Sequence, residues 1–127
     1  PFNISDFQIK YNDSYEGDLT NQLGVKSIYG YKDNLPTYDL IDKTKLYKTV
    51  VREGFPKGTI ITQNDSSPKK QKVLIFRDSF TTALVQFISL HYKEVIYING
   101  IYDQIIVDKV KPDVVISCRV ERYMLSM

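Results

Sequence analysis

Three short apolar runs, separated by two helical patterns, constrain the fold of this chain more than any other feature. The first run is Val73–Phe76, the second lies within Glu94–Ile98 and the third is Val114–Cys118. Continuous apolar runs of this kind are typical of parallel strands that are buried on both faces. Strands that alternate with helices imply right-handed crossovers in one sheet. The sequence therefore predicts an α/β fold, with a parallel sheet and a β-α-β-α-β order over residues 72–118.

The two helical patterns are defined by their apolar spacing and by their ends. The first helix is predicted to begin at Phe80 and to lie on the sheet through Phe80, Ala83, Leu84, Phe87 and Ile88. The second is predicted over residues 101–111, where the apolar positions are Ile101, Ile105 and Val110. Asn99-Gly100 forms a turn before this helix, and Pro112 ends it.

The junction between the first strand and the first helix is the candidate functional feature. Arg77, Asp78 and Ser79 separate the two elements, so Ser79 is expected at the carboxyl end of a strand and the amino end of a helix. Open α/β sheets bind ligands at this edge, and helix N–H groups can stabilise an oxyanion there. Aspartate and serine are also ordinary helix N-caps, so simple capping is the alternative interpretation.

A set of motifs resembles one known family. Residues 75–80, 94–97, 111–116 and 120–123 are similar, in that order, to the C-terminal half of the SGNH-hydrolase-like polysaccharide O-acetyltransferases. That group includes the alginate O-acetyltransferases and relatives named for an Asp-His-His-Trp motif. Segments 5–9 and 17–24 also resemble parts that precede the serine motif, so the resemblance covers most of residues 5–123. It implies a flavodoxin-like, SGNH-type sheet.

The resemblance also implies an activity and a set of site residues. Ser79 would be the nucleophile of O-acetyl transfer to a cell-envelope or extracellular polysaccharide, through an acetyl-serine intermediate. From their positions around Ser79, the N–H groups of Ser79 and Phe80 are the nearest oxyanion donors, Asp78 would shape the turn, and Arg77 would brace the loop or bind a carboxylate. Two further candidates, Glu121 and Arg122, would lie at the same sheet edge, as site residues or as a structural ion pair.

The partners follow from the same resemblance. They are a polysaccharide acceptor and a membrane protein that donates the acetyl group, which implies an extracytoplasmic location in the periplasm, on the cell surface or outside the cell. No cofactor is expected. An esterase that releases acetate would differ only in using water as the acceptor.

The chain departs from the family in its histidine. A serine hydroxyl needs an adjacent base, and in the family an Asp-x-His pair upstream supplies it. The only histidine here is His91, about 18 Å from Ser79 along a helix. Hydrogen-bond reach is about 3 Å, so His91 is excluded as the base. Either a missing upstream segment supplies Asp-x-His, or the chain is an inactive relative, and the first explanation is favoured.

A second class of function is a non-catalytic flavodoxin-like module that binds an anion or a protein. The hydroxyls of Ser79, Thr81 and Thr82 would suit a phosphate at a helix start. No glycine there lets the backbone approach a ligand closely, which argues against it. A third interpretation keeps a polysaccharide ligand without catalysis.

Composition excludes several classes. The net charge of +2 is too small for a nucleic-acid protein, and the cluster of Lys69, Lys70 and Lys72 is interpreted as a solvated connector. No apolar run reaches the ~20 residues of a membrane span. Cys118 is the single cysteine, so no intrachain disulfide is possible and no metal site is expected.

Residues 1–127 are predicted to form a single domain, the C-terminal portion of a longer SGNH-like catalytic domain. Residues 72–127 would be the α/β core, and residues 1–71 irregular apart from a short strand at 7–10 and a hairpin. The hairpin strands are predicted at 46–53 and 59–63, with a five-residue loop at 54–58. The hairpin would be a wall of the substrate cleft or a cover for the sheet edge.

Overall fold

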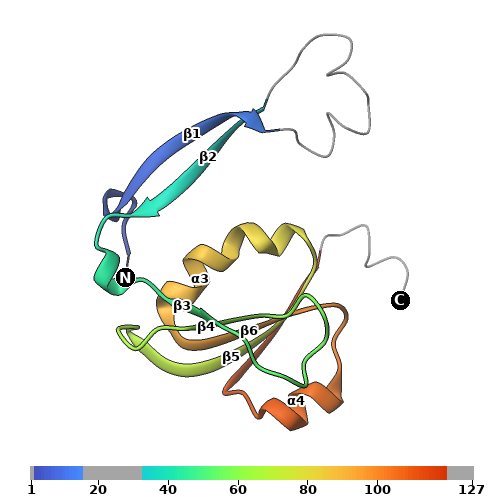
Figure 1. The fold of residues 1–127 in the computed structure, drawn as a ribbon. Coiled ribbons are helices and arrows are strands. Elements are labelled where there is room, and N and C mark those ends of the chain that lie inside the picture. The colour runs from blue at the N-terminus through green and yellow to red at the C-terminus, as the bar shows by residue number, and fades with distance from the viewer. Residues whose placement is uncertain (1, 16–32, 120–127) are drawn as a thin grey trace, which may run out of the picture. The chain divides into compact units, whose positions relative to one another are not determined.

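The computed structural model describes residues 2–15 and 33–119 (Figure 1). These residues form two compact units, Phe2–Lys43 and a second unit that begins at Thr44. The prediction of one domain as part of a longer catalytic domain stays a prediction.

The N-terminal unit is a two-stranded antiparallel sheet. After the 3-10 turn η1 (Ile4–Asp6), strand β1 (Phe7–Tyr15) pairs with β2 (Asp33–Leu40), from the Phe7–Leu40 pair to the Tyr15–Asp33 pair. The sequence predicted only a short strand at 7–10, so the expectation that this region is otherwise irregular is wrong for both strands. Pro36 lies inside β2, and a two-stranded sheet tolerates it because each strand has an edge where an N–H group is not needed.

The second unit contains a mixed five-stranded sheet with the order β3-β4-β6-β5-β7. Its strands are β3 (Lys48–Val50), β4 (Ile60–Gln63), β5 (Lys69–Arg77), β6 (Tyr92–Asn99) and β7 (Val114–Cys118). β5 runs parallel to both β6 and β7, whereas β4 runs antiparallel to β6 and to β3. The predicted α/β class and β-α-β-α-β order are therefore confirmed. The sheet as a whole is mixed, because the hairpin extends it by antiparallel pairing.

The β3–β4 hairpin is confirmed in its pairing, but its predicted dimensions are wrong. β3 ends at Val50 and β4 begins at Ile60, so the connection is longer than the predicted loop at 54–58. This connection is bound to the rest of the unit instead of to a partner strand. Phe55 packs against the core, and the Lys109 ammonium lies 5.3 Å from the centre of its ring.

Two short helices cover opposite faces of the sheet, as Figure 1 shows for α3 (Val85–His91) and α4 (Gln104–Val110). On one face Val85 and Ile88 pack with the buried side chains of Val73, Ile75, Val95 and Tyr97. On the other face Ile106, Val107 and Val110 pack with Ile61, Leu74, Phe76, Ile96 and Ile98. The central strands β5 and β6 are thus buried on both faces, as their apolar runs predicted.

The predicted apolar face of the first helix is correct for Ile88, which packs against the core, but wrong for Phe80 and Leu84. The helical segment begins as the 3-10 helix η3 (Phe80–Leu84), which has about three residues per turn and not the 3.6 assumed from the spacing. Phe80 and Leu84 are consequently 51% and 46% exposed, and the buried positions are Thr81, Val85, Ser89 and Leu90.

Hydroxyl groups fix this helix to the sheet. The Thr62 hydroxyl donates to Ser89 Oγ at 2.8 Å, and Ser89 Oγ lies 2.8 Å from the Tyr97 hydroxyl. All three side chains are buried, and the Tyr97 hydroxyl also donates to the Val85 carbonyl at 3.4 Å. The buried face of α3 is therefore partly polar, which an apolar pattern cannot reveal.

The predicted apolar face of the second helix is correct for Val110, which is buried in the core, but wrong for Ile101 and Ile105. Asp103 is the N-cap, and its carboxylate accepts the Ile105 N–H at 2.8 Å, so the helix begins only at Gln104. That start turns Ile105 outward, where it is 78% exposed, and Ile101 lies before the helix at 67% exposed. The helix ends at Val110, and the C-cap residue Lys111 adopts a left-handed conformation with φ 48°.

The third apolar run does not have the burial that its composition predicts. β7 is an edge strand, and within the part of the chain that the structure describes it pairs only with β5. Val115 and Ile116 are 38% and 37% exposed, whereas their partners Leu74 and Ile75 are 0% and 1% exposed.

Candidate functional site

Ser79 lies on the turn between β5 and η3, and it is exposed. Its backbone is in the right-handed helical region, with φ −64° and ψ −30°, so the turn is unstrained. β5 is the middle one of three parallel strands, and the chain goes from it to β6 on one side and then to β7 on the other. This reversal is the kind of switch point at which open α/β sheets bind ligands. Both the exposure and the parallel neighbours agree with the predicted position of Ser79.

Asp78 closes the first turn of the helical segment. Its Oδ1 accepts the N–H groups of Phe80 at 3.0 Å and Thr81 at 3.2 Å, and also the Thr81 hydroxyl at 3.3 Å. Asp78 therefore shapes the turn, as its position beside Ser79 predicted. The Phe80 N–H is already used in this arrangement, so an oxyanion would have to compete with the Asp78 carboxylate for it.

The backbone N–H of Ser79 is the other oxyanion donor that the sequence predicts. Of the hydrogen-bonding groups of Ser79, only its carbonyl has a partner among residues 2–15 and 33–119: it accepts the Thr82 N–H at 3.2 Å. Its N–H and its hydroxyl are therefore available within the described part of the chain, beside the same turn.

The Arg77 side chain holds this turn in place through hydrogen bonds. Its side chain is buried, at 7% exposed, and its Nη1 donates to the Asp78 carbonyl at 3.2 Å and to Thr82 Oγ1 at 2.9 Å. Its Nη2 donates to the Gly58 carbonyl at 3.3 Å. The guanidinium thus joins the serine turn to the β3–β4 connection. The sequence did not predict the contact of Arg77 with Thr82, which was considered only as a phosphate ligand, and it gave no indication of Gly58, because no local pattern points to a contact with a residue so distant in the sequence.

The anion-binding alternative finds little room at this helix start. The Thr81 side chain is buried and its hydroxyl faces Asp78, while Thr82 Oγ1 accepts from Arg77. The Asp78 carboxylate also occupies the place at which a phosphate would meet the first N–H groups. An incoming anion would be repelled by this carboxylate, so the arrangement favours a capped turn over a phosphate site.

The remaining candidates fall into two groups. Glu121 and Arg122 lie outside the described residues, as do the motif at 120–123 and the segment at 17–24. His91 is the last residue of α3, at the far end of the helical segment from Ser79. Burial, followed by the nearby charge of Lys69, lowers the pKa of His91. Its position agrees with its exclusion as the base for Ser79.

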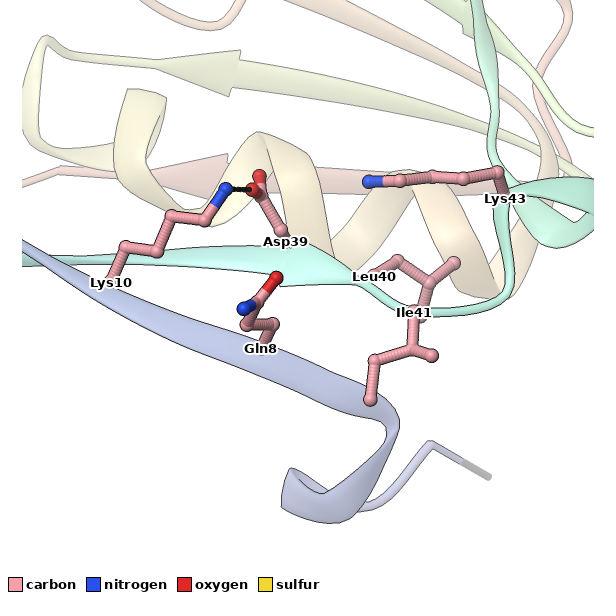
Figure 2. A pocket seen from close by; sticks show the side chains of 6 residues that line it. All are labelled: Gln8, Lys10, Asp39, Leu40, Ile41 and Lys43. Carbon is pink, nitrogen blue, oxygen red and sulfur yellow. Dashed lines mark hydrogen bonds and ion pairs between the residues drawn. The ribbon is translucent and has the colours of Figure 1, made fainter.

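A separate hollow lies on the N-terminal unit (Figure 2), with a volume of about 530 Å³. Its lining residues are Gln8, Lys10, Asp39, Leu40, Ile41 and Lys43. Figure 2 shows the ammonium groups of Lys10 and Lys43 on either side of Asp39, and Lys10 Nζ lies 2.7 Å from the carboxylate. The hydrogen bond and charge of Lys10, with the charge of Lys43, lower the pKa of Asp39. Because Asp39 is held as an ion pair, this hollow contains no evident acid, base or nucleophile.

Within residues 2–15 and 33–119, neither a metal-binding cluster nor a membrane-spanning helix is present. No cluster of three or more histidine, cysteine, aspartate or glutamate side chains there could hold a metal ion. No helix there is long and apolar enough to cross a membrane.

Comparison with known proteins identifies the fold. PatB1 of Bacillus cereus, solved with a sulfonyl adduct, superposes with a TM-score of 0.71 and 11% sequence identity, and PatB1 without that adduct gives 0.67 and 11%. The chain has a PatB1-like fold. A DHHW family protein from Eubacterium siraeum gives a TM-score of 0.63 and 12% identity. No protein-family model matches the sequence, and no curated protein matches it at a significant level.

The extent of these matches is informative. The two PatB1 structures match 97% of this chain and the DHHW protein matches 91%, but the matches cover only 50%, 52% and 48% of those chains. The chain thus spans about half the length of the solved structures that it resembles. DHHW is the one-letter form of Asp-His-His-Trp, so one of these proteins belongs to a group named in the sequence resemblance. The SGNH-type details of the fold stay a prediction.

Proposed function

We propose that this chain carries the nucleophile of a serine-dependent O-acetyltransferase that modifies a cell-envelope or extracellular polysaccharide. The observation that carries the proposal is the exposed Ser79 on the turn after the central parallel strand β5. The fold supports it, because PatB1 is an O-acetyltransferase and the chain has a PatB1-like fold. The sequence resemblance adds the acceptor class and an extracytoplasmic location.

The reaction would proceed in two acyl transfers. Ser79 Oγ would attack the carbonyl carbon of the acetyl donor while a base takes the hydroxyl proton. As the tetrahedral intermediate collapses, the bond between the acetyl group and the donor breaks, and the base gives that proton to the departing deacetylated donor. The N–H of Ser79 would stabilise the negative oxygen of that intermediate. A sugar hydroxyl then attacks the acetyl-serine ester and gives its proton to the base, and Ser79 recovers its hydroxyl as the acetylated sugar leaves.

The base has to come from outside the residues described here. Since His91 is excluded, we assign the role to an Asp-x-His pair in an upstream segment of a longer polypeptide. A membrane protein would supply the acetyl group. Arg77 and Asp78 have structural roles in this scheme and do not react, because their hydrogen bonds hold the turn on which Ser79 lies.

A covalent labelling experiment tests the proposal. The protein encoded by the complete gene is treated with a sulfonyl fluoride or a fluorophosphonate, and the labelled residue is located by peptide mass spectrometry. Ser79 is expected to be labelled, and Ser79→Ala is expected to abolish labelling. Ser66→Ala is the matched control, because Ser66 is also an exposed serine of the same unit. Absence of label on Ser79 in a protein with an intact upstream histidine would refute the assignment.

A second measurement separates transferase from esterase. The protein is given an activated acetyl ester with and without a soluble oligosaccharide, and acetate and acetylated sugar are both measured. A transferase should place acetyl on the sugar, and Ser79→Ala should remove that product while Ser66→Ala retains it. Release of acetate alone, at a rate that oligosaccharides leave unchanged, would favour the esterase.

A further inference from the structure

The hollow on the N-terminal unit receives polar side chains from both strands of the β1–β2 sheet. Gln8 and Asp39 are register partners, so their side chains point to the same face of the sheet. Lys10 lies two residues after Gln8 and therefore points to that face as well. The strand pairing thus gathers an amide, a carboxylate and an ammonium group on one face, as Figure 2 shows.

An apolar side chain is held at the end of the same face. The Ile41 N–H donates to the Asp6 carbonyl at 2.9 Å, which continues the pairing of the two strands one position beyond Leu40. Ile41 lies two residues after Asp39, and its side chain lines the hollow while it is 63% exposed. Small-ligand sites are typically hollows of roughly 300–1,000 Å³ that combine apolar surface with a few fixed polar groups, and this hollow of about 530 Å³ has both.

The charged groups of the hollow keep most of their hydrogen-bonding capacity. Lys10 Nζ donates to Asp39 Oδ2 at 2.7 Å, and an ionised carboxylate can accept several hydrogen bonds in addition to this one. Lys43 acts on Asp39 through its charge alone, so its ammonium group keeps its N–H donors. The two lysines hold the pKa of Asp39 below its ordinary value, so the carboxylate is charged at neutral pH. A strong acceptor and strong donors therefore lie side by side.

We propose that this hollow binds one sugar residue of the polysaccharide acceptor, at a subsite formed by the N-terminal unit alone; the inference rests on the proposed function. A hydroxyl group both donates and accepts hydrogen bonds. Neighbouring sugar hydroxyls can thus donate to Asp39 and accept from Lys43 or Gln8, while the C–H groups of the ring pack on Ile41. Because the acceptor is a polymer, one of its residues can be held here while another is acetylated.

The charges of the hollow favour a sugar over a simple anion. Lys10 and Lys43 contribute two positive charges and Asp39 one negative charge, so the net charge is only +1. The Asp39 carboxylate would repel an incoming phosphate, whereas it attracts the hydroxyl hydrogens of a sugar. Removal of this carboxylate therefore has opposite effects on the two ligands. It should weaken the binding of a sugar and strengthen the binding of an anion.

Calorimetric titration with defined oligosaccharides tests the inference. The protein encoded by the complete gene, with Ser79→Ala to prevent turnover, is titrated with tetrasaccharides of glucose, N-acetylglucosamine or galacturonate, and with inorganic phosphate as the anion probe. At least one tetrasaccharide is expected to bind. Asp39→Ala should weaken that binding about tenfold, as for a lost hydrogen bond to a charged group, and Lys43→Gln should weaken it less, because glutamine still donates. Asp65→Ala and Lys57→Gln are the matched controls, because both side chains are exposed on the other unit.

The substitutions should leave the fold intact. The side chains of Lys10 and Asp39 are 58% and 47% exposed, and an exposed ion pair adds little stability, so circular dichroism of Asp39→Ala should match that of the parent protein. Absence of heat with all three tetrasaccharides at millimolar concentration would overturn the inference, as would equal affinity in Asp39→Ala. Phosphate binding that becomes tighter in Asp39→Ala, without sugar binding, would show an anion site and would overturn it as well.

Kinetics and labelling of the active protein separate this inference from the proposed function. In acetyl transfer to the tetrasaccharide that binds, Asp39→Ala should raise KM about tenfold and leave kcat unchanged, because the hollow holds no reacting group. A lower kcat at unchanged KM would overturn the subsite. Sugar binding that depends on Asp39, without labelling of Ser79, would support the subsite and refute the acetyltransferase. Labelling of Ser79 without sugar binding would support the enzyme and overturn the subsite.

Discussion

Replacing Tyr97 by phenylalanine tests how the helix that follows Ser79 is fixed to the sheet. The Tyr97 hydroxyl lies 2.8 Å from Ser89 Oγ, and both side chains are 0% exposed. Without the Tyr97 hydroxyl, the buried Ser89 hydroxyl loses one of its hydrogen-bond partners. A buried polar group that loses its partner costs about 1–3 kcal/mol, so Tyr97→Phe should lower the free energy of unfolding by about that amount at neutral pH.

The same residue makes a prediction about alkaline pH. Burial raises the pKa of Tyr97 from 10.0 to about 12, although the hydrogen bond from Ser89 acts in the opposite direction. The unfolded chain releases this proton near pH 10 and the folded chain holds it to about pH 12, so ionisation favours the unfolded state between these values. The contribution of the protonated Tyr97 hydroxyl to the free energy of unfolding is complete below pH 10, and it falls by roughly 3 kcal/mol as the pH rises to about 12.

The assay is urea unfolding of the wild type and of Tyr97→Phe at several values of pH between neutrality and strong alkali. The variant should lose less stability over the alkaline range, so the gap between the two proteins should narrow as the pH rises. Tyr47, whose pKa is also raised by burial, is present in both proteins, and its negative charge contributes to the raised pKa of Tyr97. Tyr102→Phe is the control, because Tyr102 is 49% exposed. A constant gap at every pH would refute the reasoning.

Two other predictions concern an ion pair and a helix face. Arg52 donates from both terminal nitrogens to Glu94, and this hydrogen bond is the main reason that the pKa of Glu94 is lowered. The ion pair stabilises the folded chain above pH 4.5, the ordinary pKa of the carboxyl, and this stabilisation is lost as the pH falls below that value. In Arg52→Met the free energy of unfolding should therefore fall less on acidification than in the wild type, by on the order of 1 kcal/mol, a figure kept small because Arg52 is partly exposed. An unchanged acid branch would contradict this. In α4, thermal unfolding should show a loss of about 1 kcal/mol for Val107→Ala and less than about 0.5 kcal/mol for Ile105→Ala, and the reverse order would show that the helix face is misassigned.

The order of elements in the C-terminal part could be predicted from sequence because each strand carries its own signal. Val73–Phe76 and the run within Glu94–Ile98 are apolar throughout, and both belong to strands that are buried on their two faces. The position of Ser79 followed directly, since it lies where the first of these runs ends. Its role as a nucleophile rests on the family resemblance and stays a prediction.

The helix faces could be predicted only in part, at Ile88 and Val110, because apolar spacing assumes one helical period and an apolar core. The segment after Ser79 begins with a 3-10 turn, and it buries Thr81 and Ser89 while Phe80 stays exposed. Those buried hydroxyls depend on Thr62 and Tyr97, which are distant in the sequence.

Strand β2 was missed for a related reason. Its sequence contains Pro36 and lacks a strong apolar run, so its assignment depends on pairing with β1. Long-range pairing leaves little local signal in either strand. The contact between Arg77 and Gly58 belongs to the same class, because it joins two segments that only the folded sheet brings together.

That contact has a consequence for how proteins of this fold can change. The Arg77 guanidinium links the connection before β4 to the turn that carries Ser79, and it is buried away from solvent. An insertion near Gly58 would thus alter the position of Ser79, although the two residues lie on separate loops. Among homologues, we expect the length of this connection and the identity of the residue at position 77 to vary together.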